Sequence, residues 1–215
     1  MGRRAGTGSQ SSRAAWTRSR VIALPGDPED LHSRYIEALI NGVRVGCLYL
    51  PNGNPAPGPK FDYRLRWLER LTKHAQELLA SAEPVVLAGD YNVIPTEIDV
   101  YKPEHWLKDA LFLPEVRSAF ADLVAMGWTD ALRKLHPEER AYTFWDYFRN
   151  AWMRDADFRS AWMRDAGLRI DHLLLSHSAA ARLVSAGVDR EVRGWGKASD
   201  HAPAWIVIAD RAQSQ

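Results

Sequence analysis

The chain has 215 residues, with 28 Lys and Arg against 27 Asp and Glu. This length suits one domain, and a hydrophobic content of 46% is typical of globular proteins. The net charge of +1 excludes a strongly basic composition, although a local basic patch stays open. A single cysteine, Cys47, excludes an intrachain disulfide and a Cys-rich zinc site, and it fits a reducing, cytoplasmic location. No apolar run approaches the ~20 residues that span a bilayer, and the N-terminus lacks the apolar segment of a secretory signal.

Residues 1–24 open the chain with a Gly-, Ser- and Arg-rich stretch that shows neither helical nor strand periodicity. Such a stretch is predicted to be disordered. We expect one domain over residues 25–210 and a short tail over 211–215.

Within the domain, helices and strands follow each other without a strict βαβ rhythm, which predicts an α/β or α+β layered fold. Residues 34–40 and 43–50 read as two strands joined by an Asn-Gly turn of type I′. Residues 61–82 carry one apolar stripe at helical spacing. The further expected elements are strands at 83–92, 142–148, 168–176 and 203–208, and helices at 114–128 and 178–187.

A tandem repeat interrupts the second half of the chain. The segment "FRNAWMRDAD" (148–157) precedes "FRSAWMRDAG" (158–167), and eight of the ten positions are identical. A recent duplication is the simpler explanation, and a selected surface loop is the alternative. Because a flexible loop absorbs extra residues at small entropic cost, we expect a surface excursion near 148–160, with Trp152 or Trp162 more exposed than its twin.

Polar residues stand at the ends of four expected strands, where an apolar core does not explain them. They are Tyr49, Asp90 with Asn92, Asp171, and Asp200 with His201. Active sites of layered α/β proteins often gather side chains from several strand ends. Carboxylates, an amide, a phenol and an imidazole without a thiol suit Mg²⁺-assisted phosphoryl chemistry, because Mg²⁺ prefers oxygen ligands. Each residue taken alone also fits a turn, a cap or the core; Asp171, inside an apolar strand, is the hardest to explain that way.

The motifs "LYLPNG", "VVLAGDYNVIPTEIDVY", "YTFWDY", "GLRIDHLLLS" and "KASDHAPAW" together resemble, in order, those of the exodeoxyribonuclease III family. That family lies in the endonuclease/exonuclease/phosphatase superfamily and includes class II abasic-site endonucleases. The resemblance implies a four-layer sandwich of two packed β-sheets flanked by helices. It also implies a Mg²⁺-dependent (Mn²⁺ possible) DNA-repair nuclease, a 3′→5′ exonuclease and abasic-site endonuclease, that acts as a monomer on double-stranded DNA and has no membrane partner.

Residue roles follow from the same resemblance. Asp90 would orient or deprotonate the attacking water, and Asn92 would stabilise the transition state. His201 would hydrogen-bond the scissile phosphate, with Asp171 orienting its ring, and Tyr49 would contact the phosphate or assist the leaving oxygen. The remaining assignments are substrate contacts by Asn52, Phe144 and Trp145, and a metal site at Asp90, Asn92 and Asp200.

The family usually begins with a strand carrying an Asn and a "QET"-like strand end whose Glu binds metal, and no "QE" pair precedes Tyr49. We therefore expect an N-terminally incomplete fold, with one sheet short of strands, an exposed apolar face and weak Mg²⁺ affinity. Read one base out of frame with GC-rich codons, residues 1–20 can encode a strand similar to the family's "GVAILSR", so the hypothesis is a frameshifted tail. Two alternatives to the nuclease stay open: an inactive remnant or weak DNA-binding module, and a phosphatase of the same superfamily.

Overall fold

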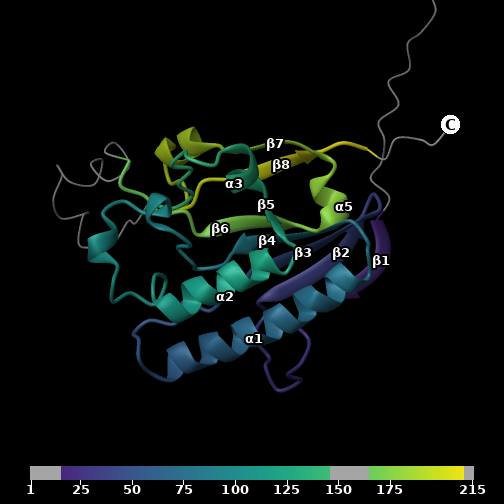
Figure 1. Ribbon diagram of the computed structural model, residues 1–215, viewed down its shortest axis with the longest axis horizontal. Coiled ribbons are helices and arrows are strands. Elements are labelled where there is room, and N and C mark those ends of the chain that lie inside the picture. Colours follow the sequence, from purple (N-terminus) through teal and green to yellow (C-terminus); the bar gives the residue numbers. More distant parts are fainter. Residues whose placement is uncertain (1–15, 146–164, 211–215) are drawn as a thin grey trace, which may run out of the picture.

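The structure is a computed structural model that describes residues 16–145 and 165–210, with the backbone alone for 16–20 (Figure 1). The expected excursion at 148–160, together with Trp152 and Trp162, lies outside the described residues.

A six-stranded mixed sheet forms the centre of the molecule, in the order β1-β2-β3-β4-β6-β5. Only β3 and β4 run parallel; the other neighbours are antiparallel. The strands are β1 (Trp16–Val21), β2 (Tyr35–Ile40), β3 (Val43–Tyr49), β4 (Val85–Asp90), β5 (Thr129–Asp130) and β6 (Asp171–Leu175). Asn41 and Gly42 join β2 to β3 with φ angles of 48° and 75°. Positive φ at both positions is what the expected type I′ turn requires.

Two helices, α1 (Pro59–Ala80) and α2 (Pro114–Ala125), cover one face of this sheet (Figure 1). The apolar stripe of α1 packs Trp67, Leu68 and Leu71 against the sheet residues Leu48 and Leu87. The helix predicted from the 3.6-residue period is thus present. Packing of its apolar face against the sheet contributes most of its stability. Gly127, with φ of 125°, follows the C-cap residue Met126 of α2, so the helix ends three residues before the end of the predicted range.

A second sheet packs on the opposite face. In the described part of the chain it comprises β7 (Leu183–Val188) and β8 (Ala204–Ile208), paired antiparallel. The short helices α3 (Ala131–Leu135) and α5 (His177–Ala180) lie beside it, and residues 97–99, 103–105 and 190–194 form 3₁₀ turns. Alternate residues of β8 face the first sheet, and those between them face outward. The exposed outward residues are Val184, Trp205 and Val207, the apolar face expected of a sheet short of strands.

Three sequence-based element predictions were wrong in the described residues. Of the strand expected over 142–148, residues 142–145 form only the isolated bridges of Phe144, and residues 146–148 lie outside the described residues. The helix expected over 178–187 is confined to α5, and Leu183–Val188 is a strand, because pairing with β8 outweighs the helical preference of an alanine-rich segment. Trp16–Val21, expected to be disordered, forms β1 on the edge of β2, since a sheet edge offers hydrogen bonds that local periodicity does not reveal.

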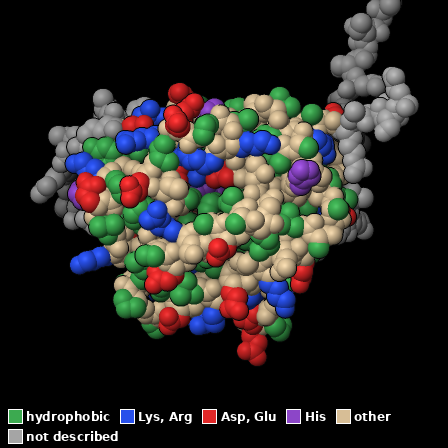
Figure 2. All heavy atoms as spheres, viewed as in Figure 1, with side chains coloured by type: hydrophobic (Ala, Val, Ile, Leu, Met, Phe, Trp, Pro, Cys, Tyr) green, Lys and Arg blue, Asp and Glu red, His purple; other side chains and the backbone are tan. Residues whose placement is uncertain are grey.

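Acidic and basic side chains are interspersed over the face shown in Figure 2, in keeping with the near-zero net charge. Among the helices of the described ranges, none is long and apolar enough to cross a membrane.

Candidate active site

Three adjacent strands place one polar residue each in a single row. Tyr49 of β3 is the register partner of Asp90 of β4, and Asp90 is the partner of Asp171 of β6. Register partners in neighbouring strands point to the same face of a sheet. The row therefore faces the side on which β7 and β8 pack, at the strand ends where the polar loops begin.

His201 completes the row from the loop before β8. A hydrogen bond of 2.8 Å joins its Nδ1 to Oδ2 of Asp171, and its Nε2 lies 4.0 Å from Oδ2 of Asp90. Burial alone would lower the pKa of His201, but the hydrogen bond and charge of Asp171, helped by Asp90 and Asp200, raise it above the ordinary value. The imidazole is thus held as a cation or a ready donor between two carboxylates.

The pKa of Asp90 is raised as well, and for a carboxyl this shift favours the neutral form. Burial, together with the negative charge of Asp171, raises the pKa of Asp90 to about 7, against the lowering effects of the Asn92 amide, His201 and Arg64. A carboxyl whose pKa lies near neutrality can accept a proton from water and release it again at working pH.

Asn92 lies between the loops that follow β3 and β4. Its backbone N–H donates to Oδ1 of Asp90 at 2.8 Å, and its side-chain amide donates to Leu50 O at 2.9 Å and to Oδ2 of Asp90 at 3.2 Å. Its Oδ1 accepts from Nδ2 of Asn52 at 3.1 Å. With 4% of its surface exposed, Asn92 orients Asp90 and ties the Asn52 loop to the site.

Arg64 of α1 lies beneath both loops and was not anticipated from the sequence. Its guanidinium donates to the carbonyls of Asn52 and Asn92, and it is fully buried. Burial lowers the pKa of Arg64 to about 10, against the attraction of Asp109 and Asp90. Gly53 makes this approach possible, because a Cβ at its φ of 84° would lie 2.6 Å from Cδ of Arg64.

The two aromatic candidates occupy different environments. The Phe144 ring lies 5.0 Å from the imidazole of His201, centroid to centroid, so it borders the site. Trp145 is 1% exposed and packs with Tyr142 and Ala202. The structure therefore corrects the expected substrate contact by Trp145: adjacent residues of an extended segment point to opposite sides, and Trp145 points into the core.

Asp200 directly precedes His201, and its negative charge helps to raise the pKa of His201. Oδ1 of Asp200 accepts a hydrogen bond from the Ser199 hydroxyl at 3.3 Å. Among the described residues no group of three or more His, Cys, Asp or Glu is arranged to hold a metal ion. The donor set nevertheless suits a hard cation, since the carboxyl groups of Asp90 and Asp171 repel each other across one register pair. Mg²⁺ commonly takes one or two protein carboxylates and completes its shell with water and phosphate.

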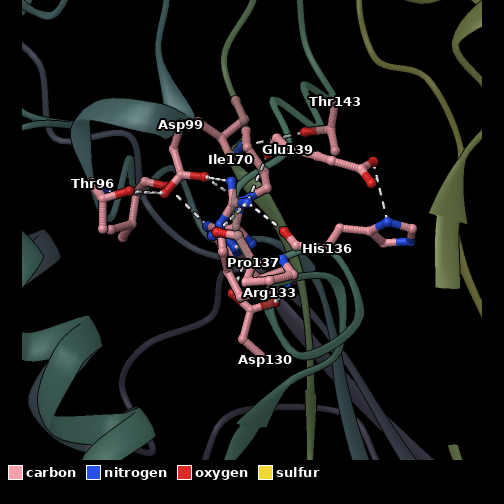
Figure 3. Close-up of polar contacts among 12 residues, drawn as sticks. Thr96, Asp99, Asp130, Arg133, His136, Pro137, Glu139, Thr143 and Ile170 are labelled. Carbon is pink, nitrogen blue, oxygen red and sulfur yellow. Dashed lines mark hydrogen bonds and ion pairs between the residues drawn. The ribbon is translucent and has the colours of Figure 1, made fainter.

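A buried ion-pair network lies just before β6 and is centred on Arg169, two residues before Asp171 (Figure 3). Arg169 is 1% exposed and donates through Nε to Oδ1 of Asp99 at 2.6 Å and through Nη1 to Oδ2 of Asp130 at 2.7 Å. Arg133 donates to the same oxygen of Asp99. The network fixes the segment that delivers Asp171 to the row.

Arg34 is a second residue that the sequence reasoning missed. Its guanidinium lies 5.0 Å from the centroid of the Tyr49 ring and donates to Tyr49 O at 3.3 Å. Tyr49 itself is 51% exposed, so this pair presents a phenol and a cation at the open side of the row. Arg34 directly precedes β2, but nothing in its local sequence marks it as part of a site.

Comparison with known proteins shows which protein family carries this chain's pattern. The pattern of the Endonuclease/Exonuclease/phosphatase family matches residues 6–201. The chain belongs to this family. It is 32% identical over 189 residues to the exodeoxyribonuclease of Bacillus subtilis, and the match covers 87% of the chain and 69% of that relative. It is 33% identical over 184 residues to the DNA repair nuclease APEX1 of Danio rerio, covering 85% of the chain and 54% of the relative.

Solved structures agree with this placement. The 3′ phosphatase NExo from Neisseria, bound to a product DNA hairpin, superposes with a TM-score of 0.81 at 36% identity, over 92% of the chain and 73% of that structure. An AP endonuclease from Archaeoglobus fulgidus gives the same TM-score at 33% identity, over 91% of the chain and 72% of that structure. The chain is thus a member of the exodeoxyribonuclease III and AP endonuclease group of DNA-repair nucleases. It spans about half to two thirds of its sequence relatives' length, with 54% for APEX1 and 69% for the Bacillus protein.

Proposed function

We propose that the chain hydrolyses phosphate esters of double-stranded DNA at abasic sites and at 3′ ends, with Mg²⁺ as cofactor. The observation that carries the proposal is the position of His201, hydrogen-bonded to Asp171 at 2.8 Å and 4.0 Å from Asp90. This arrangement offers a proton acceptor and a proton donor within reach of one phosphate. Relatives named as exodeoxyribonuclease and AP endonuclease support DNA as the substrate.

Each side chain of the row has a separate role in the proposed hydrolysis. Asp90, with its raised pKa, accepts the proton of the attacking water. His201, whose pKa is raised by the hydrogen bond and charge of Asp171 against the effect of burial, donates through Nε2 to a phosphate oxygen and stabilises the charge that develops there. Tyr49 contacts the phosphate from the exposed end of the row, and Phe144 borders the sugar side. Asn92 and Asn52 hold Asp90 and its loop in register.

Asp90 and Asp200, with Asn92 as a further oxygen ligand, would hold the Mg²⁺ ion. When bound, the ion supplies positive charge that neutralises the phosphate and relieves the repulsion between carboxylates. Asp171 stays with His201, because its hydrogen bond to the imidazole already uses one of its oxygens.

The test is cleavage of duplex oligonucleotides that carry an abasic site, a 3′ phosphate or a recessed 3′ hydroxyl, with Mg²⁺ and with a chelator. Cleavage of the abasic strand by the full chain, abolished by chelation, is the expected result. The variant His201→Ala should lower kcat at least about 100-fold, because it removes both a proton donor and a stabilising charge. His177→Ala, at the exposed first position of α5, is the matched control and should retain activity.

The alternative, a DNA-binding module without hydrolysis, makes the opposite prediction. The folded chain would then bind a fluorescent abasic duplex, measured by anisotropy, and release no product on any of the three substrates. Equal activity of His201→Ala and the unmodified chain would contradict the assignment of the site.

A further inference from the structure

Asp171 and His201 lie 30 residues apart in the chain. The two segments that carry them are not paired as neighbouring β-strands, so their hydrogen bond requires something else to hold the segments together. Asp171 begins β6, whereas His201 lies in the loop before β8. A third segment, residues 142–145, runs between them. One residue of it, Thr143, contacts both sides.

The side chain of Thr143 holds the β6 segment. Its hydroxyl oxygen accepts the backbone N–H of Ile170 at 3.2 Å and that of Asp171 at 3.1 Å (Figure 3). The Thr143 backbone N–H donates to Leu168 O at 2.8 Å, which anchors the segment that leads into β6. An oxygen that accepts two amides fixes the backbone from which the Asp171 carboxyl projects.

The main chain of Thr143 holds the other segment. Its carbonyl accepts the N–H of Ala202, the residue after His201, at 2.8 Å. Phe144 follows and packs its ring 5.0 Å from the imidazole, while forming isolated bridges to Leu168 and His201. Thr143 is fully buried, so water does not compete for these contacts, and buried amides depend on protein acceptors.

We propose that Thr143 is a positioning residue that sets the geometry between Asp171 and His201. It clamps the strand that bears the carboxylate through its hydroxyl and the loop that bears the imidazole through its carbonyl. The proposal rests on the proposed function in so far as this pair acts on DNA. It extends that function by a residue that touches neither substrate nor metal.

Substitution can separate the two arms of the clamp. Thr143→Val keeps the branched shape and the backbone carbonyl but removes the acceptor of the Ile170 and Asp171 amides. Thr143→Ser restores the acceptor without the methyl group. Thr72→Val is a matched control, because the Thr72 hydroxyl donates only to Leu68 O within α1, in the described residues. Thr143→Ala removes the acceptor without adding bulk, in case the valine variant does not fold.

Two measurements on the full chain test the proposal. The first is kcat and KM on a duplex with a single tetrahydrofuran abasic-site analogue. Thr143→Val, or Thr143→Ala in its place, should lower kcat roughly 10- to 100-fold with KM changed less than about twofold, because small displacements of a reacting group cost that much. Thr143→Ser should recover most of kcat, and Thr72→Val should match the unmodified chain.

The second measurement is the downfield NMR signal of the imidazole N–H that faces Asp171, assigned by its loss in His201→Ala. It should persist in Thr143→Ser and vanish or shift upfield in the valine or alanine variant. Unchanged kcat and an unchanged signal in that variant would overturn the proposal, as would a serine variant no better than valine. A chain that cleaves no DNA would refute the proposed function, while the imidazole signal would still decide the role of Thr143.

Discussion

Replacing Asp99 by Asn tests the buried network that holds the start of β6. Asp99 is fully buried and accepts from Nε of Arg169 at 2.6 Å, from Arg133, and from the Thr96 hydroxyl at 2.7 Å. The asparagine amide would keep the shape of the side chain but not its charge, and it would turn an NH₂ group toward donors. Arg169 would be left with Asp130 as its one carboxylate partner among the described residues.

The size of the effect follows from these contacts. Breaking a buried ion pair by removing one partner costs about 3–5 kcal/mol. The lower end applies here, because Arg169 keeps Asp130 and the Arg133 side chain is 18% exposed. A loss of about 3 kcal/mol in the free energy of unfolding corresponds to a fall in Tm of about 6–12 °C for a domain of this size.

The loss in the free energy of unfolding caused by Asp99→Asn should also depend on pH. Burial alone would raise the pKa of Asp99, but the charge and hydrogen bonds of Arg169, with those of Arg133 and Thr96, hold it far below the ordinary value of 3.8. A folded-state pKa below the unfolded value contributes stability that is fully present above the unfolded pKa and lost as pH falls below it. The difference between Asp99→Asn and the unmodified chain should therefore be constant from about pH 5 to 8 and narrow below about pH 4.

Urea unfolding, followed by tryptophan fluorescence and circular dichroism across this pH range, measures the effect. Asp122→Asn, at an exposed position of α2, is the control and should change stability by less than about 0.5 kcal/mol. Two results would refute the reasoning. One is a loss of unfolding free energy below about 1 kcal/mol for Asp99→Asn. The other is a difference in unfolding free energy between the variant and the unmodified chain that stays constant below about pH 4.

Two further predictions concern the row itself. Asp171→Asn should lower the pKa of His201, because it removes the hydrogen bond and the charge of Asp171 that raise it. It should also lower the pKa of Asp90 by removing a repulsive charge. Both limbs of the pH–rate profile then move to lower pH, and an unshifted profile would count against the roles assigned here. Gly89→Ala should destabilise the fold by about 3 kcal/mol or more in thermal unfolding, because a Cβ at its φ of 145° would lie 1.9 Å from a carbonyl oxygen of β3. Gly196→Ala, whose Cβ would meet nothing within 4 Å, should leave Tm unchanged.

Local chemistry was enough to predict part of the fold. The leucine spacing of α1 and the Asn41-Gly42 turn are properties of a few neighbouring residues, and both elements are present. The segment over 178–187 was misjudged because a short alanine-rich run fits a helix or a strand equally well. Its partner β8, more than fifteen residues away, decides the outcome.

The candidate site divides in the same way. The sequence by itself determined which residue types stand at the strand ends, because Tyr49, Asp90, Asp171 and His201 interrupt apolar runs and resemble family motifs in order. Only the tertiary structure decided which contacts they make. Arg64, Thr143 and the buried side of Trp145 carry no local signal, since a hydrogen bond across segments depends on where distant backbone lies and not on neighbouring letters. Strand register places the carboxylates side by side, and burial together with that proximity raises the pKa of Asp90 to about 7.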